Sequence, residues 1–199
     1  MKAVRWITGR GVPLPRRDID TDQIIPSRYL KRIERTGFGE GLFAEWRQDP
    51  TFVLNDPRYA GAEILITGAN FGCGSSREHA AWALEDHGFR AIVAERFADI
   101  FRGNALKIGL LPVELPADTV DALVRAVTAD PTIGINIDVA ERTLHCGRLA
   151  VSFPLDDHAA ERLLQGLDDI AITLRSGDDI AAYEARRPTY LPMVAVPGR

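Results

Sequence analysis

Short apolar runs alternate with helix-like stretches through the middle of the chain. Four or five apolar residues standing together between turn residues indicate a buried strand, and apolar residues that recur every three or four positions indicate a helix. On these two patterns we predict strands over 63–67, 91–94 and 110–114 and helices over 76–87, 97–107 and 119–127. A regular alternation of strand and helix is typical of an α/β domain.

The N-terminal part of the chain has a weaker pattern. Residues 3–7 are predicted to form a strand, which Pro13 and Pro15 should end because proline has no N–H group to offer a neighbouring strand. Residues 27–58 show little periodicity and contain three separated glycines. We therefore expect an irregular or mobile excursion there, with one short helix near 42–46.

The C-terminal third returns to strands and then to helices. Apolar and polar residues alternate over 135–153 around two turns, which predicts a β meander. Asp156 and Asp157 are suited to cap a helix over 158–166, and a serine three positions before an aspartate predicts a further helix over 178–186. Strands that follow an α/β block favour a mixed sheet over a purely parallel one.

The composition is that of an ordinary globular protein. A net charge of −4 favours neither nucleic acid nor an anionic membrane surface as a partner. No apolar run approaches the roughly 18 residues of a membrane-spanning helix, and the first residues lack the apolar core of a secretory signal. Two cysteines do not make a disulfide framework. We expect a cytoplasmic protein.

The segment from Gly72 to His79, Gly-Cys-Gly-Ser-Ser-Arg-Glu-His, carries the most potential chemistry. It lies between a predicted strand and a predicted helix, so its glycines let the backbone approach a ligand closely where free helix-start N–H groups are available. Arg77 adds a cation that can bind a carboxylate through two parallel hydrogen bonds. The segment therefore suits an anionic substrate.

A purely structural interpretation of the same segment stays open. Ser75 and Glu78 have the spacing of a capping box, in which the serine hydroxyl only accepts a hydrogen bond from the start of its own helix. Known phosphate and nucleophile motifs do not fit: Arg77 replaces the third glycine of a dinucleotide loop, and neither a P-loop lysine nor a Gly-x-Ser-x-Gly elbow is present.

The same residues resemble a known family, the swivelling domain of aconitase-type hydro-lyases. The resemblance covers about residues 1–160 and implies an α/β swivelling β/β/α domain with a mixed sheet, followed over 161–199 by a helical C-terminal extension of the same domain. Four segments carry it in the family's order: Asp20–Pro26, Asn70–Ala81, Arg90–Ala98 and Asn104–Pro112.

Within that family the chain is most similar to the separate small subunits that act on isopropylmalate. The resemblance implies that 2-isopropylmalate and 3-isopropylmalate are interconverted through isopropylmaleate, in leucine biosynthesis, with a 4Fe–4S cluster acting on the leaving hydroxyl. Such a cluster needs three or four thiolates, and this chain has two cysteines. No cofactor or metal is therefore expected on this chain, and the cluster is expected on a large-subunit partner.

The motif positions imply roles for the serine turn. Ser75 is the implied catalytic base, with Ser76 as the alternative, and Ser76 and Arg77 are implied to bind a carboxylate of the small dicarboxylate substrate. Cys73 and His79 are interpreted as structural, a small turn residue and a packing or supporting residue.

Two upstream positions complete the predicted site. Asp22 falls where the family has an active-site carboxylate, so it is expected to orient a guanidinium or to assist proton transfer, with an Asx turn or helix cap as the alternative. Tyr29, Leu30 and Lys31 occupy the place of the substrate-recognition loop, where Leu30 beside Tyr29 would contact an isopropyl group.

Other functions remain open on the sequence alone. Basic residues near Leu30 allow a tricarboxylate, which leaves open the small subunit of a homoaconitase. The small subunit of a citraconate or methylmalate hydro-lyase is a further alternative within the class. A non-catalytic carboxylate-binding module is the alternative from a different class, although binding alone does not call for a candidate base.

Overall fold

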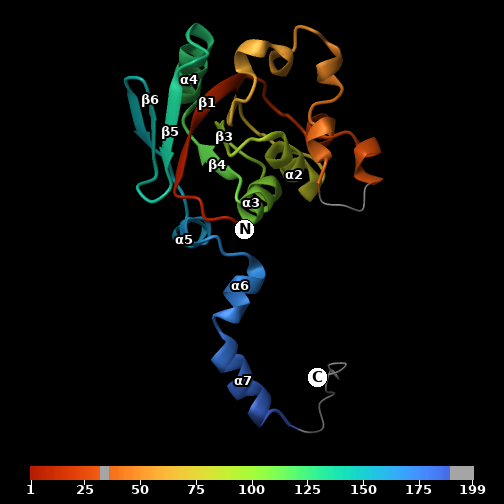
Figure 1. Cartoon of the computed structure of the whole chain (residues 1–199), viewed down its shortest axis with the longest axis vertical. Coiled ribbons are helices and arrows are strands. Elements are labelled where there is room, and N and C mark those ends of the chain that lie inside the picture. The colour runs from red at the N-terminus through yellow and green to blue at the C-terminus, as the bar shows by residue number, and fades with distance from the viewer. Residues whose placement is uncertain (32–35, 189–199) are drawn as a thin grey trace.

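The computed structural model describes residues 1–31 and 36–188, and its centre is a seven-stranded mixed sheet (Figure 1). The sheet has the order β4-β3-β2-β1-β5-β6-β7. Its strands are β1 (Trp6–Leu14), β2 (Ile64–Thr67), β3 (Ala91–Ala94), β4 (Leu111–Glu114), β5 (Gly134–Asp138), β6 (Thr143–Cys146) and β7 (Leu149–Ser152).

Helices and single helical turns surround this sheet in the part of the chain described. The α-helices are α1 (Thr21–Ile24), α2 (Glu78–His87), α3 (Asp99–Ile108), α4 (Ala117–Ala129), α5 (Asp157–Gln165), α6 (Asp169–Leu174) and α7 (Gly177–Arg186). The 3₁₀ turns are η1 (Ser27–Lys31), η2 (Phe38–Gly41), η3 (Trp46–Gln48), η4 (Val53–Asn55) and η5 (Pro57–Tyr59).

Strand β1 joins the parallel and the antiparallel halves of the sheet. Its second half pairs in parallel with β2, from Gly11 opposite Ile64 onward, and its first half pairs antiparallel with β5, up to Arg10 opposite Gly134. Strands β2, β3 and β4 continue in parallel, and β5, β6 and β7 form an antiparallel meander. The predicted α/β class, mixed sheet and meander are confirmed.

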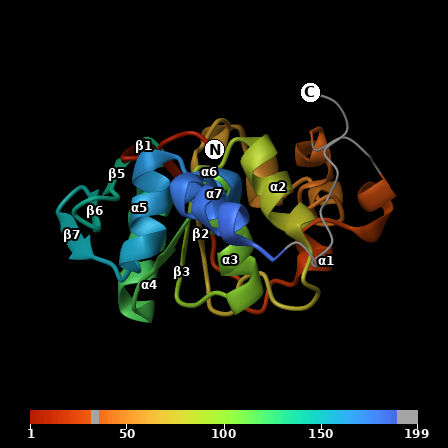
Figure 2. The same cartoon turned by 90° about the horizontal axis from the view of Figure 1, so that it is seen from below.

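Both faces of the parallel half are buried. In β2, Leu65 packs into one apolar cluster with α2 and α3, whereas Ile64 and Ile66 pack into a second cluster with α4 and α5. Figure 2 shows these two helix pairs on opposite sides of the strands. Because side chains alternate across a strand, a strand covered on both faces is apolar at every position. This explains the continuous apolar runs in the sequence.

The N-terminal predictions need two corrections: the strand predicted over 3–7 begins only at Trp6, and it is longer than predicted. Strand β1 does not end before Pro13 but runs through it to Leu14. Pro13 lies opposite Ile66 of β2, beyond the last residue that pairs with β5. The missing N–H is tolerated because one side of β1 has no neighbouring strand at that point.

The segment 27–58, in so far as it is described (27–31 and 36–58), is irregular, as predicted, but it belongs to the core. Its chain passes through five 3₁₀ turns, and in place of a helix over 42–46 it forms turns followed by η3. Large side chains from its described residues are fully or nearly fully buried against α2 and β1: Phe38, Leu42, Phe43 and Phe52.

Helices α5 and α7 lie where the sequence pattern predicted helices. Asp156 caps α5 by accepting a hydrogen bond from the Ala159 N–H at 3.1 Å. Helix α7 forms where a helix was predicted, although Ser176 makes no side-chain cap bond, and the six-residue α6 was not predicted. Along the part of the chain described, no helix combines the length and apolar character needed to cross a membrane.

Candidate functional site

The serine turn, residues 72–77, leaves the carboxyl end of β2 and leads into α2. Gly72 and Gly74 both have positive φ angles, +77° and +90°, in the left-handed region that glycine adopts at little cost. A Cβ atom at Gly72 would also lie 2.2 Å from Cγ of Phe101. Glycine is therefore required at position 72 by the backbone and by the close approach of α3.

The predicted capping box at Ser75 and Glu78 is wrong. Arg77 has an extended backbone and is the N-cap residue, so Glu78 is the first residue of α2. A capping box needs its glutamate at the third helical position. Ser75 is thus not the cap of its helix, and Arg77 provides no side-chain cap either. The first N–H groups of α2 therefore receive no help from an N-cap side chain and stay available as donors.

A second turn holds the serine turn in place. The Thr21 N–H donates to the Cys73 carbonyl at 2.9 Å, and Thr21 Oγ1 donates to the Ser75 carbonyl at 3.1 Å. Thr21 is 1% exposed and is the first residue of α1. Asp20 caps that helix in a full capping box with Gln23. Two motifs about fifty residues apart in sequence are therefore joined by one backbone and one side-chain hydrogen bond of Thr21.

Asp22 lies against Arg77. The Arg77 guanidinium donates to Asp22 Oδ1 in an ion pair in which the Asp22 side chain is 56% exposed and the Arg77 side chain 26% exposed. The cap of α1 is Asp20, so Asp22 is not needed as a helix cap. The contact fits the predicted orientation of a guanidinium by this carboxylate, and the catalytic role of Asp22 stays a prediction.

The two serines are accessible. Gly74, Ser75 and Ser76 are all exposed, next to the half-buried Arg77. Their hydroxyl groups can thus be reached by a ligand or by a second protein that approaches this edge. The structure brings Ser75, Ser76, Arg77 and Asp22 together, as the sequence predicted.

The surroundings of Cys73 and His79 favour a structural role for both residues. Partial burial, followed by the nearby Asp20 and Asp18 carboxylates, raises the pKa of the Cys73 thiol, so this cysteine is a poor thiolate. The His79 ring packs 5.2 Å from Phe38 and 4.7 Å from Trp82, and burial lowers its pKa. Ring packing accounts for His79, and Cys73 keeps its interpretation as a small turn residue.

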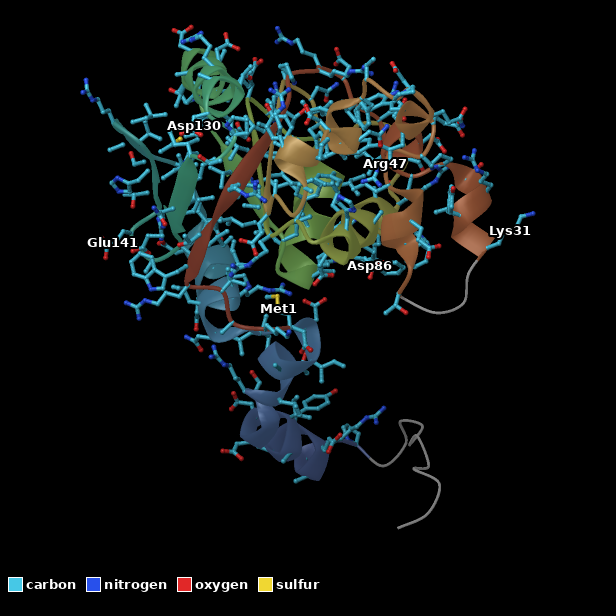
Figure 3. The ribbon with its side chains drawn as sticks, turned by 45° about the horizontal axis from the view of Figure 1, so that its top comes forward. Met1, Lys31, Arg47, Asp86, Asp130 and Glu141 are labelled. Carbon is cyan, nitrogen blue, oxygen red and sulfur yellow. The ribbon has the colours of Figure 1, made fainter. Side chains whose placement is uncertain are left out.

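The predicted recognition residues lie on η1. Tyr29 and Leu30 pack against the apolar core, and the Arg28 guanidinium lies 5.0 Å from the Tyr29 ring. Lys31 is exposed, and Figure 3 shows it at the outer edge of the molecule. Only two residues separate η1 from α1, the helix that carries Asp22.

The loops next to the serine turn hold a feature that the sequence pattern did not predict. Asp18 and Asn70 both have left-handed backbones, with φ of 55° and 59°, and the Asn70 amide donates to Asp18 Oδ1 at 2.8 Å. Asp and Asn tolerate a left-handed backbone better than most residues. Their residue type was the only feature of the sequence that could have indicated this arrangement. A hollow of about 650 Å³ opens beside them and does not include the serines; it is lined by Arg17, Asp18, Ala69, Asn70, Arg96, Phe97, Ala98 and Asp99.

The described residues offer no ligand set for a metal ion. Among residues 1–31 and 36–188, no three His, Cys, Asp or Glu side chains are grouped so that they could hold one. Cys73 lies in the serine turn and Cys146 is buried in β6, and both are free. The residues present on the described chain therefore do not fit a thiolate-bound cluster.

Comparison with known proteins identifies the class of domain. Residues 1–118, which include the serine turn, match the family model of the aconitase C-terminal domain. Residues 169–192 match the model of the C-terminal domain of the 3-isopropylmalate dehydratase small subunit. Fold and site thus define a domain of the aconitase C-terminal type.

Individual relatives narrow this class. A 3-isopropylmalate dehydratase small subunit of Parafrankia sp. is 62% identical over 98% of this chain and 100% of its own length, and that of Rubrobacter xylanophilus is 54% identical over the same shares. The chain belongs to the family of 3-isopropylmalate dehydratase small subunits. A crystal structure of 3-isopropylmalate dehydratase from Methanocaldococcus jannaschii superposes with a TM-score of 0.65 at 25% identity, covering 90% of this chain and 99% of that one.

Proposed function

We propose that this chain is the small subunit of a 3-isopropylmalate dehydratase, a hydro-lyase that works with a large subunit. It interconverts 2-isopropylmalate and 3-isopropylmalate through isopropylmaleate in leucine biosynthesis. The observation that carries the proposal is the meeting of two motifs on one surface. An exposed serine pair that caps no helix lies there beside a guanidinium held by a carboxylate, in a chain whose full-length relatives bear this name.

Ser75 is the proposed catalytic base. In the dehydration step the C–H bond of the substrate breaks, the proton passes to Ser75 Oγ, and the electron pair forms the C=C bond as the hydroxyl leaves the neighbouring carbon. Rehydration returns the proton to carbon. A serine oxygen can act in this way only when its negative charge is stabilised, and the N–H groups that begin α2 together with Arg77 are suited to do so.

Arg77 and Ser76 are the proposed carboxylate-binding groups. A guanidinium binds a carboxylate most strongly when two parallel N–H groups are presented in the right plane. The pairing with Asp22 restricts the rotation of the Arg77 side chain and leaves it open to solvent on one side. A substrate carboxylate can therefore approach Arg77 while Asp22 keeps it oriented.

The large subunit is proposed to carry the 4Fe–4S cluster. When bound there, the cluster supplies the Lewis acid for the leaving hydroxyl. This chain contributes no thiolate ligand set for it, since its two cysteines lie on separate elements and burial raises the thiol pKa of both. The cytoplasm is the proposed compartment, because free thiols suit reducing surroundings.

The recognition of the isopropyl group is proposed to fall to η1. Leu30 beside Tyr29 offers the apolar contact, and Lys31 is close enough in sequence to add a charge at its edge.

The proposed function is tested by co-expressing the chain with the large subunit from the same organism. Isopropylmalate, citrate and homocitrate are then compared as substrates of the purified complex. We expect turnover of isopropylmalate and little or none of the two tricarboxylates. A clear preference for citrate or homocitrate would contradict the assignment, and so would turnover of isopropylmalate by this chain alone.

A further inference from the structure

Helices α6 and α7 form an arm, residues 169–186, that carries exposed apolar side chains. Figure 1 shows the arm extending away from the sheet and the helices that cover it. Large apolar residues are normally well covered in a folded domain. Four on the arm are 41–72% exposed: Ile170, Leu174, Ile180 and Tyr183.

Only the first half of the arm is attached to the domain by described contacts. Arg162 of α5 binds Asp169 at 2.7 Å, and Arg175 at the end of α6 binds Glu161 of α5 at 2.8 Å. Helix α7 begins two residues later and has no buried residue. A helix shorter than about 12–15 residues is marginal in water without tertiary packing. Helix α7 has ten residues, so its side chains need a surface to pack against.

The family comparisons indicate which protein provides the surface against which α7 packs. The aconitase-type match ends at residue 118, whereas the arm lies within a separate match to the C-terminal domain of 3-isopropylmalate dehydratase small subunits. An aconitase C-terminal domain is by name part of a longer chain, but a small subunit must hold its partner without a covalent link. A segment that accompanies the separate subunit and presents uncovered apolar side chains is therefore suited to bind the large subunit.

We propose that the arm is a docking element for the large subunit, with Ile180 and Tyr183 inserted into an apolar groove of that partner. The two residues are three apart and so lie on the same side of α7. Tyrosine is enriched at the centres of protein interfaces because it combines a large apolar ring with a polar tip. The inference rests on the proposed function only in taking the large subunit as the partner.

The test compares two double variants of the full chain. Ile180→Gln with Tyr183→Gln removes the apolar side of α7, and Ala182→Gln with Ala185→Gln makes the matched change on the opposite side, since successive residues are about 100° apart around a helix. Binding of fluorescently labelled small subunit to the large subunit is measured by anisotropy without substrate. Isomerisation is measured separately at saturating large subunit.

The first variant should raise the dissociation constant at least about tenfold, as expected for two central interface residues. It should leave the turnover number at saturation and the thermal unfolding of the small subunit alone unchanged. The control should bind like the wild type. An unchanged dissociation constant would overturn the proposal.

Other occupants of this face give different results. If α7 packed against a second copy of this chain, the Ile180 and Tyr183 variant would change the self-association of the small subunit and not its affinity for the large one. If it packed against its own domain, the variant would lower the unfolding temperature of the small subunit alone. Either result, with unchanged binding, overturns docking by the arm. A complex that forms through the arm but does not turn over isopropylmalate supports the arm and contradicts the proposed function.

Discussion

Thr21 provides a sharp test of how the serine turn is held. Its hydroxyl donates to the Ser75 carbonyl at 3.1 Å, and its backbone N–H donates to the Cys73 carbonyl, so it ties α1 to the turn at two points. Replacing Thr21 by valine keeps the shape of the side chain and removes only the hydroxyl. The variant therefore separates the hydrogen bond from the packing of a residue that is 1% exposed.

The magnitude follows from what the Ser75 carbonyl retains. This carbonyl also accepts the Arg77 N–H at 2.8 Å, so it is not left without a partner when the hydroxyl is lost. The cost should be that of one net hydrogen bond, about 1 kcal/mol, and not the larger penalty of an unsatisfied buried group. If that energy is what holds the turn in its active arrangement, the turnover number should fall about fivefold.

The assay is isomerisation of isopropylmalate by the complex at saturating large subunit, with complex formation measured in parallel. Thr21→Val should lower the turnover number with unchanged assembly, and Thr21→Ser, which keeps the donor, should recover most of it. A valine variant with normal turnover, or a serine variant that is slower than the valine variant, would refute the positioning role.

Two further substitutions test the same surface. Arg77→Lys keeps the charge but loses the fork of parallel donors, so the KM for isopropylmalate should rise about tenfold, as expected for roughly 1.4 kcal/mol of lost binding; steady-state kinetics that match the wild type would contradict carboxylate binding by Arg77. Gly72→Ala combines a positive φ with a Cβ atom 2.2 Å from Phe101, whose ring is buried. Strain and overpacking together predict a loss of about 2–5 kcal/mol in the free energy of unfolding, measured by denaturant titration. The matched control is Gly103→Ala in α3, where an added Cβ atom meets nothing within 4 Å and stability should be equal or higher; equal stability of the two variants would show that the Gly72 geometry is misassigned.

Much of the sheet could be predicted from local patterns, because strands buried on both faces leave continuous apolar runs such as Ile64–Thr67 and Ala91–Ala94. Local sequence patterns were insufficient where the pairing of a strand with its neighbours decides how far that strand extends. Pro13 is accommodated because β5 ends its pairing before it, and the residues that pair with a strand cannot be read from the strand itself. The 3₁₀ turns in the described part of 27–58 were likewise not predicted one by one, since they have no period to detect.

The candidate site, too, could be predicted from the sequence only in part. The residue types at Ser75, Ser76 and Arg77 indicated an anion site, and the upstream motif indicated Asp22 as a neighbour of a guanidinium. The spacing of Ser75 and Glu78 was misleading, because it matches a capping box but α2 begins only at Glu78, with Arg77 as its N-cap residue. The role of Thr21 could not be predicted, since its hydroxyl acts on the backbone of a turn far away in sequence.

The central claim is that Ser75 supplies the base for a reaction completed by another chain. It is tested most directly by measuring isomerisation with Ser75→Ala in the assembled complex, beside Ser76→Ala and the wild type. We predict that Ser75→Ala forms the complex normally and binds isopropylmalate but has no detectable turnover, whereas Ser76→Ala keeps measurable turnover with a raised KM. Near-normal turnover by the Ser75→Ala complex would contradict the claim.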